Sequence, residues 1–232
     1  MDTPKPVCPR RELKSRNTAW ARALARIACA SGITPNAISV LSIAFAAGAF
    51  ACFWLAPDMK TAGGAALLWL AAAVCIQLRL LCNLLDGMVA VEGGKASPTG
   101  PIYNEAPDRV ADVLILVGAG YSTNVEPGVI KLFGELPLGW ACAVLAMGTA
   151  YLRLLQGTLT AQQSFMGPMA KQHRMAVLTL GTLVAAGQQL FCAEVAGSQI
   201  QGLLFALVII FIGAIVTCLR RLNLIARQLH AK

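Results

Sequence analysis

Apolar runs recur along the whole chain, and short polar segments separate each run from the next. A helix needs about 20 apolar residues to cross the roughly 30 Å hydrocarbon core of a membrane. Of the 232 residues, 57% are hydrophobic and only 13% are charged, whereas about 25% are charged in soluble domains. We therefore predict an all-α integral membrane protein with six transmembrane helices, at about residues 36–56, 61–85, 108–121, 136–156, 175–192 and 199–219.

Lysine and arginine gather on alternate loops of this predicted topology. Seven precede the first span, one lies between the second and third, two lie between the fourth and fifth, and four lie in the tail. The opposite loops hold only Lys60 and Lys131. Because cytoplasmic loops carry the excess of Lys and Arg, we expect a multi-pass protein of the inner cell membrane with both termini in the cytoplasm. The net charge of +8 then indicates attraction to anionic membrane lipids, and not nucleic-acid binding.

An amphipathic segment at residues 10–31 precedes the first span. On a helix, Trp20, Leu24 and Ile27 share one face, and Arg22 and Arg26 share the opposite face, as a helix lying in the membrane interface requires. The Thr-Pro-Asn sequence at 34–36 ends this helix and can cap the next one, because proline cannot continue a helix. We predict a single domain over residues 1–232, with the interfacial helix, a six-span bundle at 36–219 and a basic tail at 220–232.

Five acidic residues interrupt the apolar pattern at residues 82–112. Asn83 and Asp86 are three residues apart, so they are predicted to project together from the cytoplasmic end of the second span. Asn104, Asp108 and Asp112 are spaced by four, which places them on one face at the start of the third. Carboxylate and amide oxygens suit a hard divalent ion such as Mg²⁺, Mn²⁺ or Ca²⁺ far better than Zn²⁺. The two helix ends are therefore expected to present ligands to one site.

The connection between these two helix ends is rich in glycine, at positions 87, 93, 94 and 100. Such a segment is flexible, and its backbone can approach a phosphate closely. Inside a helix, Pro107 would remove the hydrogen bond to the Tyr103 carbonyl. The third helix is therefore predicted to begin near Pro107, with Asn104 in the turn that leads into it.

This stretch resembles the CDP-alcohol phosphotransferase family, whose signature reads Asp-x-x-Asp-Gly-x-x-Ala-Arg, eight residues, then Gly-x-x-x-Asp-x-x-x-Asp. Asp86, Gly87, Ala90, Gly100 and Asp108 match it at the same spacings. The resemblance covers nearly the whole chain, because the six-span topology, the interfacial helix and the Thr-Pro-Asn sequence are also similar. The chain departs from the signature at three positions, which are Asn83, Val91 and Asn104. A branch of the family has a similar Asn-x-x-Asp-Gly-Met pattern, which here spans residues 83–88.

In the family, the aspartates hold two divalent ions on the pyrophosphate of a CDP-linked donor, and the last is thought to deprotonate the acceptor alcohol. The resemblance implies Asp86 as the strongest ligand of Mg²⁺ or Mn²⁺, Asn83 and Asn104 as neutral ligands, and Asp108 as ligand or general base. It further implies that Gly87, Ala90 and Gly100 shape the cytidine diphosphate pocket, and that the protein is a homodimer.

Two carboxylates bring less negative charge than the four of the family signature, and ligand charge tunes metal affinity. Either one ion suffices, or Asp112, Glu105 or Glu92 supplies the missing charge. Asp112 is the best placed of the three because it shares the face of Asp108. Arg79 lies four residues before Asn83 on its face and can replace the cation lost at Val91. We expect the acceptor to enter near three further basic residues, which can bind a phosphate if it has one; these are Arg153, Lys171 and Arg174.

The leading hypothesis is a transferase that moves a phosphatidyl group from CDP-diacylglycerol to a polar alcohol and releases CMP. Within the same family, a donor of the CDP-choline or CDP-ethanolamine type acting on diacylglycerol is the alternative. A pseudoenzyme that keeps the fold and the nucleotide pocket is a third reading, because two motif acids are asparagine. A small cation transporter fits less well, since it predicts ionisable residues near mid-bilayer in several spans, whereas here they gather at one membrane boundary.

Overall fold

The computed structural model of the chain describes residues 18–95, 97–123, 138–160, 162–191 and 201–230. Within these ranges the chain is helical, and no strand is present. The helices are α1 (Ala19–Ala30), α2 (Pro35–Leu55), the short 3₁₀ helix η2 (Ala56–Asp58), α3 (Ala62–Glu92), α4 (Gly100–Ser122), α5 (Leu138–Thr160), α6 (Lys171–Phe191) and α7 (Gln201–His230). The all-α prediction is therefore confirmed for the part of the chain that the structure describes.

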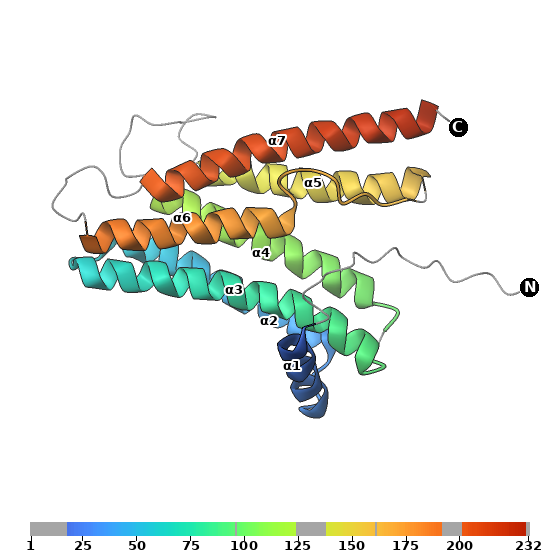
Figure 1. Ribbon diagram of the computed structural model, residues 1–232, viewed down its shortest axis with the longest axis horizontal. Helices are drawn as coiled ribbons and strands as arrows, with labels where there is room; N and C mark the ends of the chain where they lie inside the picture. Colours follow the sequence, from blue (N-terminus) through green and yellow to red (C-terminus); the bar gives the residue numbers. More distant parts are fainter. Residues whose placement is uncertain (1–17, 96, 124–137, 161, 192–200, 231–232) are drawn as a thin grey trace, which may run out of the picture.

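The long helices α2 to α7 lie side by side in one bundle, and α1 projects from one end of it at a steep angle (Figure 1). The α2 helix packs against both α3 and α4, and α3 also packs against α6. On the other side, α5 packs against α4 and α7, and α6 packs against α7. The bundle thus brings α3, α4 and α6 around one region, although α3 and α6 lie far apart in the sequence.

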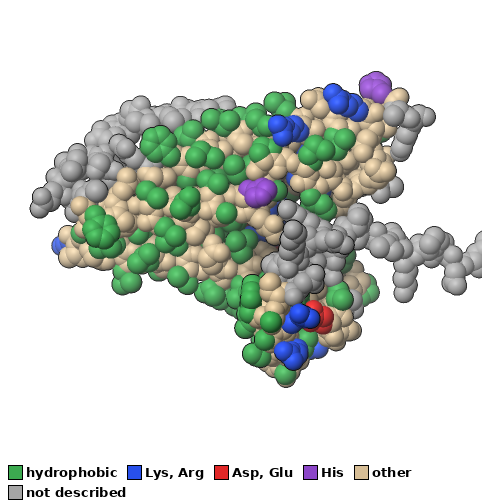
Figure 2. Space-filling view, in the orientation of Figure 1, with side chains coloured by type: hydrophobic (Ala, Val, Ile, Leu, Met, Phe, Trp, Pro, Cys, Tyr) green, Lys and Arg blue, Asp and Glu red, His purple; other side chains and the backbone are tan. Residues whose placement is uncertain are grey.

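Four helical segments are long and apolar enough to cross a membrane: Pro35–Asp58, Ala62–Glu92, Leu138–Thr160 and Gly202–His230. Apolar side chains are distributed along the length of the bundle, and the basic side chains in view lie mostly on α1 and on the C-terminal half of α7 (Figure 2). The other two predicted spans correspond to α4 and α6, in which charged and amide side chains make up a larger share of the helix, and which do not meet the same criterion. The six-span topology and its orientation therefore stay predictions.

The first helix begins at Ala19, and residues 10–17 of the predicted interfacial helix lie outside the described residues. Its contact with the bundle is made by Ala21 and Ala25, which are fully buried against α3. Trp20 and Ile27 remain more than half exposed. Small side chains allow the close approach of two helices, which leaves the larger apolar side chains of α1 facing outward. Insertion of this face into the membrane interface stays a prediction.

The second helix begins where the Thr-Pro-Asn sequence predicts. Thr34 is the N-cap residue of α2, and its hydroxyl oxygen accepts a hydrogen bond of 3.2 Å from the backbone N–H of Ala37. Pro35 occupies the first turn, where a helix tolerates the missing N–H. The turn between α1 and α2 passes through Gly32, whose φ of 78° is a left-handed conformation that suits glycine.

The predicted start of the third transmembrane helix is wrong. The α4 helix begins at Gly100, and Pro107 lies inside it. Pro101 stands in the first turn, so the proline that marks the helix start is Pro101 and not Pro107. The cost of Pro107 is one backbone hydrogen bond to the carbonyl of Tyr103. As a result Asn104, Asp108 and Asp112 all belong to one continuous helix.

Candidate active site

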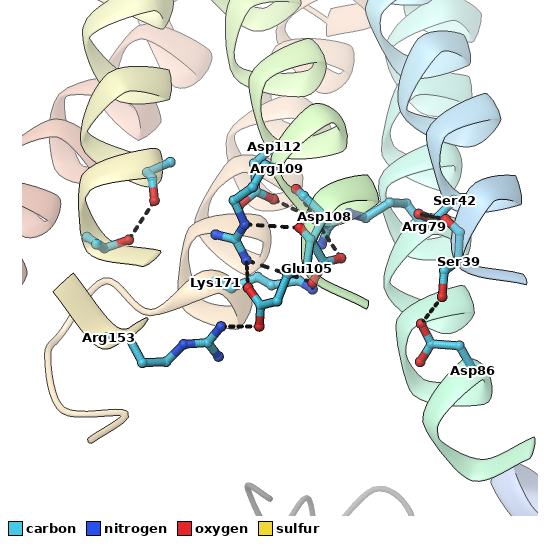
Figure 3. Close-up of polar contacts among 12 residues, drawn as sticks. Ser39, Ser42, Arg79, Asp86, Glu105, Asp108, Arg109, Asp112, Arg153 and Lys171 are labelled. Atoms are coloured by element: carbon cyan, nitrogen blue, oxygen red, sulfur yellow. Dashed lines mark hydrogen bonds and ion pairs between the residues drawn. The ribbon is translucent and has the colours of Figure 1, made fainter. Parts of the chain in front are cut away.

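The Asp86 carboxylate lies on α3 and points toward α2 (Figure 3). Its Oδ2 atom accepts a hydrogen bond of 2.7 Å from the hydroxyl of Ser39. The side chain is buried, and its Oδ1 atom has no hydrogen-bond partner among the described residues. A buried carboxylate oxygen without a partner is costly. Asp86 therefore keeps one oxygen without a partner among the described residues, and an added ligand can bind to it.

Asp108 lies on α4 and is surrounded by basic side chains. Lys171, the first residue of α6, contacts its Oδ2 atom, and Arg109 lies 4.0 Å from the same atom. Arg79 of α3 lies 3.4 Å from Oδ1 and donates a hydrogen bond of 3.2 Å to the Asp108 backbone carbonyl. The Oδ1 atom is buried and accepts no hydrogen bond within the described residues. Asp108 thus resembles Asp86 in having one carboxylate oxygen without a hydrogen bond, although this oxygen is also in an ion pair with Arg79.

Asp112 lies one turn further along α4, and both of its oxygens are occupied. Oδ1 accepts a hydrogen bond of 2.6 Å from Arg79, and Oδ2 accepts one of 2.8 Å from Arg174 of α6. All three side chains are at most 1% exposed. Arg174 also donates to the Thr149 hydroxyl and to the Met169 carbonyl. This buried ion cluster, which we call the inner cluster (Arg79, Asp112 and Arg174), joins α3, α4 and α6.

A second ion cluster lies nearer the start of α4 (Figure 3). Glu105 accepts from Arg153 of α5 through Oε1, and from Arg109 through Oε2 at 3.2 Å. The guanidinium of Arg153 also lies 5.5 Å from the centre of the Phe165 ring, a cation–π contact. These side chains are 18% to 28% exposed, so solvent reaches them. We call Glu105, Arg109 and Arg153 the outer cluster.

The remaining sequence-predicted residues are distributed around these groups. Asn83 precedes Asp86 by one turn, and its Nδ2 atom is buried without a hydrogen-bond partner in the described ranges. Asn104 and Glu92 are exposed. Val91, where the family signature has a cation, is 61% exposed. Gly87 and Ala90 are half-buried on α3, and Gly100 is the first residue of α4. Gly94 has a φ of 60°, so the connection between the two helices includes a left-handed residue.

Sequence reasoning missed several residues that hold the site together. Ser39, which orients Asp86, is one of several small polar residues on an apolar helix, and no sequence signal sets it apart. Arg221 of α7 is buried and donates to the backbone carbonyls of Met166 and Thr149. It thereby fixes the connection from α5 to α6 against α7. Its position in a predicted basic tail suggested a lipid contact instead.

Near Asp86 and Asp108, the described motif residues offer carboxylate and amide oxygens as ligands to a metal ion. In the described part of the chain, no three His, Cys, Asp or Glu side chains converge on one point. The two open carboxylate oxygens nevertheless fit the hard-ion chemistry of Mg²⁺ or Mn²⁺, and Asn83 and Asn104 are the nearest motif residues that can add neutral oxygens. The site is thus compatible with a divalent ion whose ligand set is only partly acidic.

Comparison with protein-family models finds no match for this chain. Among curated proteins, it is similar to the inner membrane protein YnbA of Escherichia coli (strain K12), with 27% identity over 122 residues. The similar region makes up 52% of this chain and 55% of YnbA. It therefore spans about half the length of that relative.

The fold is that of solved structures of the phosphatidylinositol phosphate synthase PgsA1 of Mycobacterium tuberculosis. The structure of PgsA1 in complex with manganese and citrate matches with a TM-score of 0.68 and 17% identity, over 88% of each chain. The structure with CDP-DAG bound matches with a TM-score of 0.65 and 17% identity, over 90% of this chain and 94% of PgsA1. The apo form matches with a TM-score of 0.61. At this level of identity the similarity establishes the fold alone.

Proposed function

We propose that the chain is an integral-membrane transferase that moves a phosphatidyl group from CDP-diacylglycerol to a polar alcohol and releases CMP. One observation carries the proposal. Asp86 and Asp108, on α3 and α4 of a bundle with the PgsA1 fold, each keep a buried carboxylate oxygen without a hydrogen-bond partner among the described residues. A PgsA1 structure of this fold holds CDP-DAG, which supports the choice of donor. The inner-membrane location, the cytoplasmic site and a homodimer are parts of the same proposal.

A divalent ion, Mg²⁺ or Mn²⁺, belongs to this proposal. The residues that would hold it are Asn83, Asp86 and Asn104, with Asp108 as a further ligand or as the general base. When bound, such an ion would stabilise the negative charge of the donor pyrophosphate. We leave Asp112 out of the ligand set, because both of its oxygens are hydrogen-bonded to arginines. For the same reason we assign Arg79 and Arg174 to the support of the site and not to the binding of donor or acceptor.

The residues of the chain account for the remaining chemistry. Oδ1 of Asp108 takes the proton of the acceptor hydroxyl, and the hydroxyl oxygen forms a bond to the phosphorus of the phosphatidyl group. The bond between that phosphorus and the CMP oxygen breaks, and CMP leaves with the electron pair. Lys171 and Arg79 fix the orientation of Asp108 during this step, and Ser39 fixes that of Asp86.

The proposal is tested by supplying purified protein with radiolabelled CDP-diacylglycerol, Mg²⁺ or Mn²⁺, and a panel of polar alcohols. We expect CMP release that requires both the ion and at least one alcohol. A parallel reaction with CDP-choline or CDP-ethanolamine and diacylglycerol tests the other donor type. If protein that binds the nucleotide releases no CMP with any acceptor, the transferase proposal is wrong.

A second candidate, a nucleotide-binding protein without turnover, is favoured by the asparagines at 83 and 104 and by the contact between Lys171 and Asp108. In that case the nucleotide and the ion bind, but the products do not form. The same assay distinguishes the two candidates, because only the transferase couples CMP release to consumption of an alcohol.

A further inference from the structure

The basic residues expected to receive a phosphorylated acceptor are already paired with acids of the chain. Lys171 contacts Asp108, and Arg174 is bound to Asp112. Arg153 is bound to Glu105, and Arg79 shares Asp112 with Arg174. Arg221, nearby on α7, directs its Nε and Nη1 atoms to two backbone carbonyls. A phosphate entering this region therefore meets cations that already contact carboxylate or carbonyl oxygens of the chain.

Glu105 has a particular position among these acids, because it holds two arginines at once. Its two oxygens are divided between Arg153 of α5 and Arg109 of its own helix. The inner cluster is almost fully buried, whereas the outer cluster is 18% to 28% exposed. Arg109 and Arg153 are therefore the arginines of the site that a solute can reach, and a carboxylate of the chain lies on both.

A phosphate that binds to Arg109 and Arg153 must either displace this carboxylate or bind beside it. Displacement is unfavourable because Glu105 is part of the same chain and is present at a high effective concentration. Binding beside Glu105 places like charges close together, which costs several-fold or more in affinity. The cation–π contact with Phe165 further fixes Arg153 and limits its movement toward another anion.

We propose that Glu105 determines the class of acceptor: by holding Arg109 and Arg153 in ion pairs, it makes the site select an alcohol without a phosphate group. This inference rests on the proposed transferase function and specifies its acceptor. Glu105 acts through the two arginines, so it sets specificity and takes no part in bond formation. Removal of its charge is then expected to create an anion-binding site where the native chain has none.

Binding of inorganic phosphate to the full-length protein in detergent micelles, measured by isothermal titration calorimetry, tests this inference directly. We expect Glu105→Gln to bind phosphate at least about tenfold more tightly than the native chain, since a single freed charge-assisted contact accounts for that factor. Glu92→Gln removes the same charge from an exposed position at the end of α3 and should leave phosphate binding unchanged. The double variant with Glu105→Gln and Arg153→Gln should lose the gain.

Two results overturn the inference. If the native chain binds phosphate as tightly as Glu105→Gln, the arginines accept an anion despite Glu105. If neither protein binds phosphate, the two arginines are not an anion site that Glu105 masks. Binding of phosphate does not depend on turnover, so these results stand whether or not CMP is released.

A competition assay provides the second measurement. Acceptors with and without a phosphate group, such as glycerol 3-phosphate and glycerol, are compared for CMP release. The native chain should prefer the uncharged alcohol, and Glu105→Gln should shift the ratio toward the phosphorylated one by about tenfold. An unchanged ratio contradicts the role of Glu105. A lack of CMP release from every protein contradicts the transferase function instead and leaves the phosphate-binding result to decide the role of Glu105.

Discussion

Asp108 and Asp112 lie one helical turn apart on α4, yet their surroundings differ in one decisive respect. Both oxygens of Asp112 are hydrogen-bonded to arginines, and the residue is 1% exposed. Asp108 is also surrounded by basic side chains, but its Oδ1 atom accepts no hydrogen bond from the described residues. A carboxylate whose bonds are complete stabilises the fold, and one with an open oxygen can bind a ligand. On this comparison we propose Asp112 as a structural residue and Asp108, with Asp86, as functional residues.

The largest expected effect is a loss of stability when Asp112 is substituted. Asp112→Asn removes the charge that compensates Arg79 and Arg174, and loss of one partner of a buried ion pair costs about 3 to 5 kcal/mol. We expect a marked fall in the thermal unfolding midpoint of the protein in detergent. Asp58→Asn, at an exposed position in η2, is the matched control and should leave the midpoint unchanged. Equal midpoints for the two variants would show that the inner cluster is not a stabilising element.

A smaller effect, on metal affinity, is expected when Ser39, the residue that orients Asp86, is substituted. Ser39→Ala removes the hydrogen bond to Oδ2 of Asp86. Loss of such a supporting contact lowers metal affinity or activity by about 10- to 100-fold. Ser42→Ala removes another buried hydroxyl of α2, whose hydrogen bond goes to a backbone carbonyl, and should have little effect. The measurement is Mn²⁺ affinity by electron paramagnetic resonance, and equal affinities for both variants would contradict the role of Ser39.

The smallest expected effect concerns Lys171. Its ammonium group contacts Asp108 and therefore opposes the binding of a cation at that residue. Lys171→Gln should raise Mn²⁺ affinity by up to about tenfold, which corresponds to roughly 1.4 kcal/mol. Lys95→Gln, in the connection between α3 and α4, removes the same charge away from Asp108 and serves as the control. A fall in affinity would show that Lys171 supports the ion site instead of opposing it.

Much of the fold could be predicted from the apolar runs, because the length and hydropathy of a helix in a membrane are set by the bilayer. The predicted bounds of α2 and α5 differ from those observed by only a few residues. The start of α4 was predicted wrongly because either Pro101 or Pro107 can mark the start of a helix. The local sequence does not show that the helix begins before Pro101 and tolerates Pro107 in its interior. Residues 124–137 and 192–200, where predicted spans begin or end, lie outside the described residues.

The site was predictable where the motif is local, and less so where distant helices meet. Spacing alone placed Asp86 and Asp108 at the ends of two consecutive helices. In the structure, Asp86 lies six residues before the end of α3, whereas Asp108 lies eight residues after the start of α4. The partners of Asp112 lie 33 and 62 residues away in the sequence, so no local pattern joins them. For the same reason, the sequence suggested Arg79 as a replacement for the cation lost at Val91 and Arg174 as an acceptor contact, but it did not show that both arginines bind Asp112.

The central claim is that the open oxygens of Asp86 and Asp108 form the reaction centre, and CMP release by Asp86→Asn tests it most directly. The substitution keeps the shape of the side chain and removes its charge, so the unfolding midpoint should stay close to that of the native protein. We predict a fall in CMP release of about 100-fold or more, as for the loss of a strong electrostatic contact in a transition state. Native rates of CMP release from a folded Asp86→Asn variant would contradict the account.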